Sequence, residues 1–342
     1  MRVAALGRTR ILLNSIYRLH EAGHEIVLIG TCTEAPEYGV SPRDFEELAC
    51  KLGVNFFNDA RINSPEILEL LKKSQADIAI SVNWLTTIKE EAVSAFRFGI
   101  LNAHAGDLPR YRGNACPNWA ILAGEKRLTS TIHLMDPKAV DEGPIVLQRH
   151  LPLQKNTTIG DIYAWFYSSV PEMFFKAVEG LASGTIIPRD QPNDPSLALR
   201  CYPRIPADSF INWKDTAEYL GRLVRASSNP FNGAYTYWKD KRLTVWQAVA
   251  VPFPCPSLAM PGQIVWRSPE KGEVGVATGD GALVLQEVQV EGEDRVKASD
   301  VLTSTRIRLG MLVEDEIATL KRRIDLLENI ILKDRCELRD NP

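Results

Sequence analysis

Short apolar runs and stretches of helical periodicity alternate along the first part of the chain. Residues 3–6 form an apolar run that predicts a buried strand, and residues 11–21 then carry apolar side chains at helical spacing. A second apolar run spans residues 25–30, and a third spans residues 77–82. A strand, a helix and a strand in this order predict a parallel sheet with right-handed crossover connections.

The same patterns predict further elements that extend this arrangement. Helices are expected over 42–51 with Ser41 as N-cap, over 64–73, over 116–123 and over 158–180, and strands over 130–134 and 145–149. The predicted fold class is therefore α/β, with an open, Rossmann-like, mostly parallel sheet flanked by helices. A Gly-x-Gly-x-x-Gly motif is absent after the first strand, so an NAD-dependent enzyme loses its main support.

The pattern changes after residue 188. Residues 189–206 contain four prolines and few apolar runs, which is typical of a linker. Short alternating segments then follow, separated by Gly and Pro as in a small β-barrel, and Gly279-Asp280-Gly281 is a hairpin turn signal. The segments span 243–249, 262–266, 273–277 and 282–288. We therefore predict a catalytic domain over 1–188, the linker, and a C-terminal β-barrel-like domain over 207–303.

Residues 304–335 are predicted to form a C-terminal helix. Apolar residues step along it by four and three, which gives a heptad stripe with charged flanks. The stripe consists of Val313, Ile317, Leu320, Ile324, Leu327 and Ile331. It is short for an independent coiled coil, so a helix docked on its own chain stays an alternative. The narrow stripe and the charged remaining faces favour a dimer-forming helix, and a homodimer is expected.

Composition narrows the function classes only slightly. The 342 residues are 45% hydrophobic and 24% charged, as in an ordinary globular protein. The net charge of −3 and the absence of a long basic block weigh against a nucleic-acid partner. No apolar stretch reaches 18 residues, so no membrane span is expected. The six scattered cysteines indicate structural thiols in a reducing compartment, and therefore a cytoplasmic protein.

Polar residues that can carry chemistry interrupt the apolar pattern between residues 99 and 145. Asn102 and His104 are two positions apart in an extended stretch, so their side chains face the same side. Asp141 lies in a turn between two apolar runs. An Asn, a His and an Asp that converge at strand ends make a plausible acid–base site.

These residues belong to a longer motif. The stretch from Asn102 to Gly113, followed by Asp141-Glu142-Gly143, resembles the family of formyltransferases that use formyl-tetrahydrofolate. The pattern of that family is Asn-x-His-x-Ser-Leu-Leu-Pro-x-x-Arg-Gly with a later Asp-x-Gly turn. Gly106 stands where the family has Ser, which clouds the substrate assignment more than the reaction type. Residues 204–213 and Asn229-Pro230 similarly resemble the C-terminal barrel of family members.

The resemblance implies formyl transfer from N10-formyl-tetrahydrofolate to a primary amine. His104 is then the acceptor of the amine proton, and Asn102 donates to the oxyanion that forms on the formyl oxygen. Asp141 orients or charge-stabilises the imidazole, or relays a proton through water. The motif does not divide the work between His104 and Asp141, whose titrations are expected to be coupled. No metal is required, and no cysteine is implicated.

The resemblance also places the co-substrate and the acceptor. Asn83, Trp84 and Leu85 follow the strand over 77–82, where the family binds the folate pterin, although Trp84 could equally be a core aromatic residue. Val140 and Asp141 complete the expected co-substrate contacts. Arg8, Arg10 and Arg112 are candidates to meet a diphosphate, with Arg112 alternatively a loop anchor. The remaining histidines are assigned structural or surface positions: His20, His24, His133 and His150.

The acceptor is the harder assignment. The tRNA enzyme of the resembling family has a basic insertion and a Gly-Thr-Pro-Glu-Phe opening, whereas residues 31–40 here are short and acidic and the opening is Gly7-Arg8-Thr9-Arg10. Residues 117–121 look more like the amino-sugar branch. A nucleotide-linked amino sugar is therefore the favoured acceptor. The alternatives are methionyl-tRNA formyltransferase, a formyl-tetrahydrofolate hydrolase, and a non-catalytic scaffold.

Overall fold

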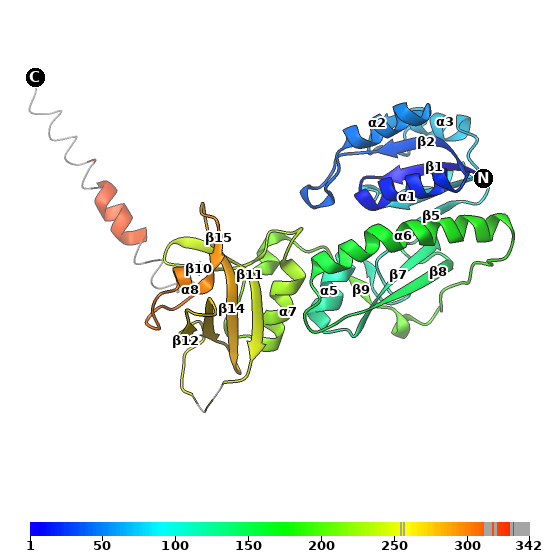
Figure 1. Ribbon diagram of the computed structural model, residues 1–342. Coiled ribbons are helices and arrows are strands. Elements are labelled where there is room, and N and C mark those ends of the chain that lie inside the picture. Colours follow the sequence, from blue (N-terminus) through cyan, green and yellow to red (C-terminus); the bar gives the residue numbers. More distant parts are fainter. Residues whose placement is uncertain (254, 256, 311–316, 318–319, 329–330, 332–342) are drawn as a thin grey trace, which may run out of the picture. The chain divides into compact units, whose positions relative to one another are not determined.

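The protein divides into two compact units in a computed structural model that describes residues 1–253, 255, 257–310, 317, 320–328 and 331 (Figure 1). The first unit comprises residues 1–208 and 225–232. The second unit comprises residues 209–224 and the described residues from 233 onward. No helix among the described residues is long and apolar enough to cross a membrane.

A seven-stranded sheet forms the centre of the first unit, in the order β3-β2-β1-β4-β5-β7-β8. The first five strands in this order run parallel, and β7 and β8 are antiparallel to their neighbours. The strands are β1 (Arg2–Gly7), β2 (Glu25–Thr31), β3 (Asn55–Asn58), β4 (Ile78–Val82), β5 (Ile100–His104), β7 (Arg127–Leu134) and β8 (Ile145–Pro152). The predicted α/β class with a mostly parallel sheet is confirmed. The short edge strand β3 was not predicted, because only Phe57 of its four residues is buried.

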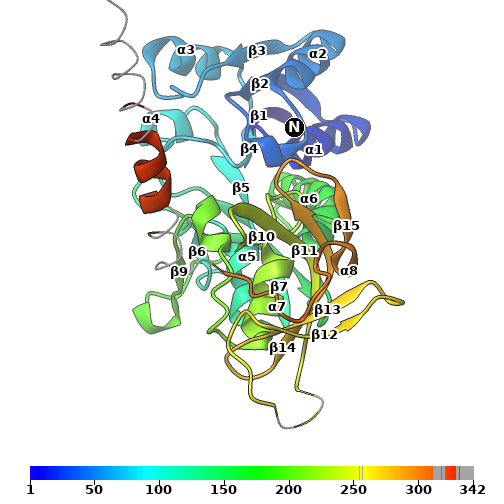
Figure 2. The same cartoon turned by 90° about the vertical axis from the view of Figure 1, so that its left-hand side faces the viewer.

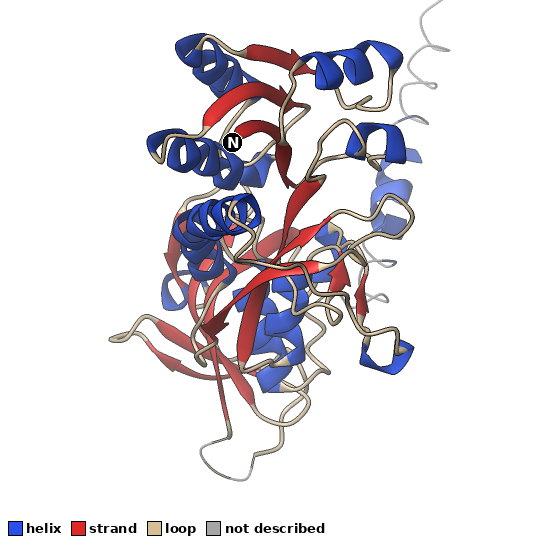
Figure 3. Ribbon diagram, turned by 90° about the vertical axis from the view of Figure 1, so that its right-hand side faces the viewer, coloured by secondary structure: helices blue, strands red, loops and turns tan. Residues whose placement is uncertain are grey.

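Helices cover both faces of this sheet (Figure 3). They are α1 (Arg10–Glu21), α2 (Pro42–Leu52), α3 (Pro65–Lys73), α4 (Glu90–Val93), α5 (Cys116–Ala123) and α6 (Ile159–Ala182). Ala4 and Leu6 of β1 share a buried cluster with Ile67 and Leu71 of α3. Alternate strand residues face the other side, where α1 and α2 lie opposite α3 and α4 (Figure 2). The apolar residues of the strands, at a period of two, and those of the helices, at a period of about 3.6, therefore pack into a sheet with a helical layer on each face.

Side-chain caps set several helix starts. Ser41 and Asp44 form a capping box at α2, and the Ser64 hydroxyl accepts from the N–H of Ile67 at α3. Both helices begin with Pro at the first turn. The predicted N-cap at Ser41 is confirmed.

The segment over 189–206 is not a linker but part of the first unit. Arg189 and Ile145 exchange two backbone hydrogen bonds of 2.7 and 2.8 Å. Further along, β9 (Arg200–Cys201) pairs in parallel with β6 (Arg112–Gly113). The prolines suggested a linker, but this segment combines a short 3-10 helix, Pro195–Leu197, with backbone hydrogen bonds to residues far away in the sequence.

An antiparallel sheet builds the second unit, in the order β10-β11-β14-β13-β12, with β15 paired to β14. The strands are β10 (Ala234–Trp238), β11 (Lys241–Val251), β12 (Ile264–Ser268), β13 (Glu273–Ala277), β14 (Ala282–Val290) and β15 (Arg295–Lys297). Two helices, α7 (Ala217–Ser227) and α8 (Ala298–Val301), accompany them. The predicted turn at 279–281 joins β13 to β14, where Ala277 pairs with Ala282.

Residues 304–310 are not helical, contrary to the predicted helix over 304–335. Ile307 and Leu309 hydrogen-bond to Ile264 and Gly262 beside β12, and the N–H of Gly310 donates to Tyr237 of β10. This extended segment therefore bonds both edges of the sheet, which gives the unit its barrel-like closure. Leu309 is buried, and its burial favours the extended conformation over a helix.

The described residues 320–328 of the tail are helical. The described members of the heptad stripe are all exposed: Ile317, Leu320, Ile324, Leu327 and Ile331. Val313 lies outside the described residues.

Candidate active site

Strands β5 and β7 place polar side chains side by side in the first unit. They are antiparallel neighbours, and their register sets Asn102 opposite His133 and His104 opposite Thr131. Asn102 and His104 are two positions apart on β5, so both face the same side of the sheet. His104 and His133 are almost fully buried, with ring centres 6.2 Å apart.

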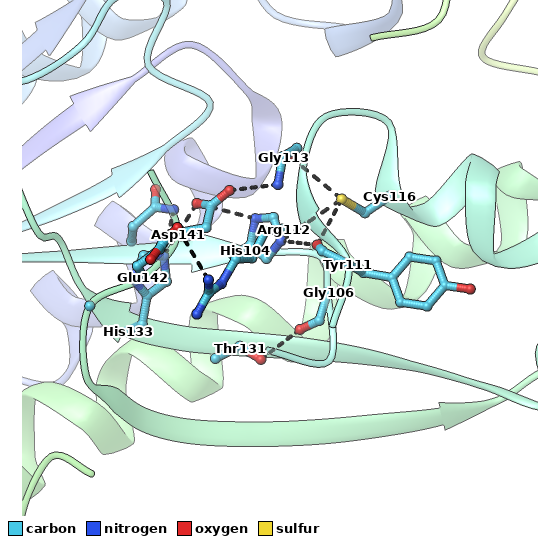
Figure 4. Close-up of polar contacts among 12 residues, drawn as sticks. His104, Gly106, Tyr111, Arg112, Gly113, Cys116, Thr131, His133, Asp141 and Glu142 are labelled. Atoms are coloured by element: carbon cyan, nitrogen blue, oxygen red, sulfur yellow. Dashed lines mark hydrogen bonds and ion pairs between the residues drawn. The ribbon is translucent and has the colours of Figure 1, made fainter. Parts of the chain in front are cut away.

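Asp141 reaches this place from the turn between β7 and β8 (Figure 4). Its backbone is left-handed, with φ +61°. Oδ1 lies 3.5 Å from His104 Nδ1 and 3.6 Å from His133 Nε2. Oδ2 accepts a 2.9 Å hydrogen bond from the N–H of Gly113. The structure thus brings together the three residues that the sequence singled out, Asn102, His104 and Asp141.

A backbone carbonyl fixes the proton of His104. Its Nε2 lies 2.6 Å from the carbonyl oxygen of Tyr111, which can only accept, so Nε2–H is the donor. Nδ1 therefore faces the Asp141 carboxylate. A neutral His104 has its lone pair on Nδ1, and this is the atom that can take up a proton.

His133 orients the Asn102 amide, a role that the sequence analysis did not assign. Its Nδ1 donates to the carbonyl of Leu134 at 2.9 Å, so Nε2 is left to accept from Asn102 Nδ2 at 3.1 Å. The sequence analysis placed His133 in a strand. Only the pairing of β5 with β7, which sets His133 opposite Asn102, identifies it as a residue of the site. That register is not visible in a local pattern.

Burial and charge set the protonation of the pair. Burial lowers the pKa of His104, and the Asp141 carboxylate and the Tyr111 carbonyl oppose this only in part. Burial alone would raise the pKa of Asp141, but the imidazole of His104, the proximity of His133 and the Gly113 N–H together lower it to about 2. Near neutral pH the pair is a carboxylate beside a neutral imidazole, which is the state that can accept a proton.

Gly106 makes room for this arrangement. A Cβ atom at Gly106 would lie 2.3 Å from the Tyr111 oxygen and 2.6 Å from His104 Nε2, so a serine there, as in the family pattern, requires both groups to move. The Gly106 carbonyl also accepts from the Thr131 hydroxyl at 2.7 Å. The departure from the family pattern therefore bears directly on the His104 hydrogen bond.

Arg112 is nearly buried and lies against the Asp141 turn. Its Nε and Nη2 donate to Gln191 Oε1 at 3.2 and 2.7 Å, and its Nη1 lies 3.2 Å from Glu142 Oε1. These contacts match the loop-anchor alternative for Arg112 better than a diphosphate contact. Gln191, which the sequence analysis placed in a linker, is a second site residue that local pattern did not reveal.

Arg8 follows β1, Arg10 is the first residue of α1, and both side chains bind backbone carbonyls. Arg8 Nε and Nη1 donate to Asn83 and Thr33, each at 2.9 Å, and Arg10 Nη2 donates to Gly39 at 2.6 Å. Carbonyl groups accept from these N–H donors without neutralising the charges, and the Asp44 carboxylate interacts with the charge of Arg10. Two cationic groups are thus held at the carboxyl edge of the parallel strands, where α/β folds bind ligands.

The expected co-substrate residues have different environments. Asn83 has φ +53° and donates to the Tyr38 hydroxyl at 3.2 Å. Trp84 packs edge-on against Phe57 and borders the buried cluster of the sheet, which supports its interpretation as a core aromatic residue.

Leu85 and Val140 are 50% and 56% exposed, so each offers an apolar side chain that a flat ring can cover. Among the described residues, no group of three or more His, Cys, Asp and Glu side chains is arranged to hold a metal ion.

The buried imidazole–carboxylate pair with a neighbouring amide, set at one end of an α/β sheet, is an arrangement that is capable of acid–base chemistry. Residues 1–178 match the family described as formyl transferase, and residues 205–306 match the formyl transferase C-terminal domain. The chain therefore belongs to the formyltransferase family. The resemblance drawn from the motif is confirmed.

Individual relatives agree with this membership. Methionyl-tRNA formyltransferase of Symbiobacterium thermophilum is 30% identical over 316 residues, which cover 91% of this chain and 94% of the relative. Among solved structures, the sugar 3N-formyl transferase WlaRD, solved with dTDP and 5-N-formyl-THF, superposes with a TM-score of 0.61 at 18% identity, covering 86% of this chain and 99% of WlaRD. HypX from Aquifex aeolicus in complex with tetrahydrofolic acid gives 0.58 at 20% identity, covering 89% of this chain and 47% of HypX.

The protein is a formyltransferase that uses formyl-tetrahydrofolate as its one-carbon donor. The predicted class of enzyme and the predicted co-substrate are confirmed.

Proposed function

We propose that Asn102, His104 and Asp141 transfer the formyl group to the primary amine of a nucleotide-linked amino sugar. The observation that carries the catalytic part is the His104 imidazole, whose Nε2 is bound to a carbonyl while Nδ1 faces a carboxylate 3.5 Å away. Such an imidazole is oriented to accept a proton at one defined atom.

The chemistry divides among the three side chains. The bound donor supplies an electrophilic formyl carbon, which the acceptor amine attacks. His104 Nδ1 takes the proton from the amine, and the Asp141 carboxylate stabilises the imidazolium. When the tetrahedral intermediate collapses, the bond between the formyl carbon and N10 of the donor breaks, and His104 returns the proton to N10, which leaves as tetrahydrofolate. Asn102 uses one N–H to bind His133, and its second N–H donates to the oxyanion on the formyl oxygen. Leu85 and Val140 cover the pterin ring system, with Asn83 beside it.

The amino-sugar acceptor is supported by two arginines between the end of β1 and the start of α1. Arg8 and Arg10 are two cations that donate to the backbone carbonyls of Asn83, Thr33 and Gly39, and a diphosphate needs such cations. WlaRD, a fold neighbour over most of both chains, is a sugar formyltransferase solved with dTDP. Methionyl-tRNA formyltransferase is the second candidate, because relatives of that name align over 91% of this chain.

One assay separates these functions. The enzyme is given N10-formyl-tetrahydrofolate and, in parallel, a panel of nucleotide-linked amino sugars, initiator Met-tRNA, or no acceptor. We expect turnover with one sugar, and a loss of about 100-fold or more in His104→Ala. The matched control is His20→Ala, an exposed histidine on α1, which should keep full activity.

Each other outcome points elsewhere. Formylation of the tRNA alone would replace the sugar by the second candidate and keep the chemistry. Release of formate without acceptor would identify a hydrolase. Full turnover of His104→Ala would overturn the assigned roles.

We also propose a homodimer held by the C-terminal helix. Ile317, Ile324 and Ile331 occupy heptad position a, and Leu320 and Leu327 occupy position d, a choice that favours two parallel strands. These side chains are exposed, so a second copy of the helix would cover them. Arg323 at position g and Glu328 at the next position e carry opposite charges, as pairing between two parallel copies requires.

We further propose a cytoplasmic location. Cys116 and Cys201 are buried free thiols, an arrangement expected where thiols are kept reduced.

A further inference from the structure

The Asp141 turn is held by a side chain that no motif identified. Gln191 follows the two-bond contact of Arg189 with Ile145 and is only 8% exposed. It lies between the turn at 141–143 and the guanidinium of Arg112. A buried amide in such a place must have its donors and its acceptor satisfied.

Both polar atoms of the Gln191 side chain are hydrogen-bonded. Nε2 donates to the carbonyls of Asp141 and Gly143 at 2.9 and 2.8 Å. Oε1 accepts from Nε and Nη2 of Arg112 at 3.2 and 2.7 Å. Carbonyl groups only accept and guanidinium groups only donate, so these partners also fix which end of the amide is nitrogen. The amide is therefore matched to its surroundings on both sides.

Gln191 holds a turn in which Asp141 has a backbone conformation that is costly in free energy. Asp141 has φ +61°, a conformation that costs free energy for a residue other than glycine. Gln191 binds the carbonyls on both sides of Glu142, and the Glu142 carboxylate itself lies 3.2 Å from Arg112 and 3.3 Å from Arg200. The turn is thus fastened through its backbone and through its middle side chain.

The position of the 141–143 turn matters because it sets the distance between the Asp141 carboxylate and two imidazoles. Its Oδ1 is 3.5 Å from one imidazole and 3.6 Å from another, and interaction energies between close charges change steeply with distance. A small rotation of the turn would move the carboxylate away from His104 Nδ1.

We propose that Gln191 is a positioning residue, which fixes the Asp141 carboxylate against His104 through the backbone of the 141–143 turn. This inference rests on the proposed role of Asp141. A carboxylate at position 191 cannot replace the amide, because it has no N–H for the two carbonyls.

The test compares Gln191→Met, which has a similar length and makes no such hydrogen bonds, with Gln247→Met, an exposed glutamine on β11. We expect kcat to fall by about 10- to 100-fold in Gln191→Met, as when a partner that orients a site group is lost. The KM for the acceptor should stay within about threefold of the original value. Gln247→Met should match the unchanged enzyme.

The pH profile separates positioning from mere destabilisation. His104 is faced by the Asp141 carboxylate, by His133 and by the Cys116 thiol at 3.8 Å. Of these, Asp141 raises the pKa of His104. If Gln191→Met lets the carboxylate move away, the acid limb of the rate profile shifts to lower pH. A variant that only unfolds more easily loses active enzyme and leaves that limb in place.

A double-mutant cycle with Asp141→Asn distinguishes failure of this inference from failure of the proposed role of Asp141. If Gln191 acts through the carboxylate, Gln191→Met costs little further activity in the Asp141→Asn background. Full additivity of the two losses would overturn the positioning role. An Asp141→Asn enzyme as active as the original would instead overturn the role of Asp141. Thermal unfolding of each variant confirms that folded enzyme is being assayed.

Discussion

Two imidazoles share one carboxylate in the first unit, and each imidazole is tied to a backbone carbonyl. These hydrogen bonds leave Nδ1 of His104 facing Asp141 and Nε2 of His133 facing Asn102. Identical side chains therefore have different tasks, because the carbonyl that each one meets lies at a different ring nitrogen. One imidazole is placed to accept a proton and the other to hold an amide.

The rate of formyl transfer should depend on the protonation of His104. Its pKa is lowered by burial from the ordinary value of 6.5, so the base is active above that depressed pKa and lost as the pH falls through it. We expect the acid limb of kcat/KM to have its midpoint below pH 6.5. Asp141→Asn should move the limb still lower, since the carboxylate raises this pKa. A midpoint above the ordinary value would contradict the assignment.

Replacing Gly106 tests the space beside His104. Gly106→Ser places a side chain where its Cβ would lie 2.3 Å from a backbone oxygen and 2.6 Å from the imidazole. We expect a loss of about 1–3 kcal/mol in unfolding free energy and a lower kcat, measured by urea unfolding and by the formyl-transfer assay. Gly221→Ala in α7, where the nearest contact would be an ordinary 3.5 Å, is the control that should leave kcat unchanged.

At the scale of elements, local periodicity predicted the strands and helices that carry the site. The two-residue spacing of Asn102 and His104 was enough to place both on one face of β5. The contributions of His133 and Gln191 could not be predicted, because they depend on the pairing of β7 with β5 and on a segment that returns to the sheet. Residues 304–310 were missed for the same reason, since their bonds go to β10 and β12.

The start of α6 offers a prediction at this scale. Thr158 and Asp161 form a capping box, with the Thr158 hydroxyl accepting from the Asp161 N–H and the carboxylate accepting from the Thr158 N–H. Thr158→Ala should lower the free energy of unfolding by about 1 kcal/mol, as measured by urea denaturation. Thr158→Ser keeps the hydroxyl and should recover most of this loss. Equal losses in both variants would assign the effect to packing of the methyl group instead.

At the scale of the whole molecule, the family matches cover both units, at 1–178 and 205–306, and end before the heptad stripe. The heptad stripe therefore lies outside the residues that the two family domains match. Its exposed isoleucines and leucines lie within a highly charged sequence, which is the composition of a helix that associates with another helix.

Light scattering tests this association. The intact chain should have twice the mass of its 38.2 kDa monomer, and Ile324→Asp should halve that mass because a charge would be buried in the helix pair. Asp325→Ala, at an outward heptad position next to it, should remain a dimer. A monomeric mass for the intact chain would contradict the proposal, and so would a dimeric mass for Ile324→Asp.

The left-handed backbone of Asp141 has a consequence for how the gene can change. Asn and Gly are the residues that tolerate φ +61° best, but Asn gives up the charge and Gly gives up the side chain. Glu keeps the charge, yet it is longer and fits this conformation poorly. No single replacement preserves the conformation, the charge and the reach together. In evolutionary terms this position has no neutral amino-acid replacement, so a lineage that retains the activity has no stepwise route away from aspartate.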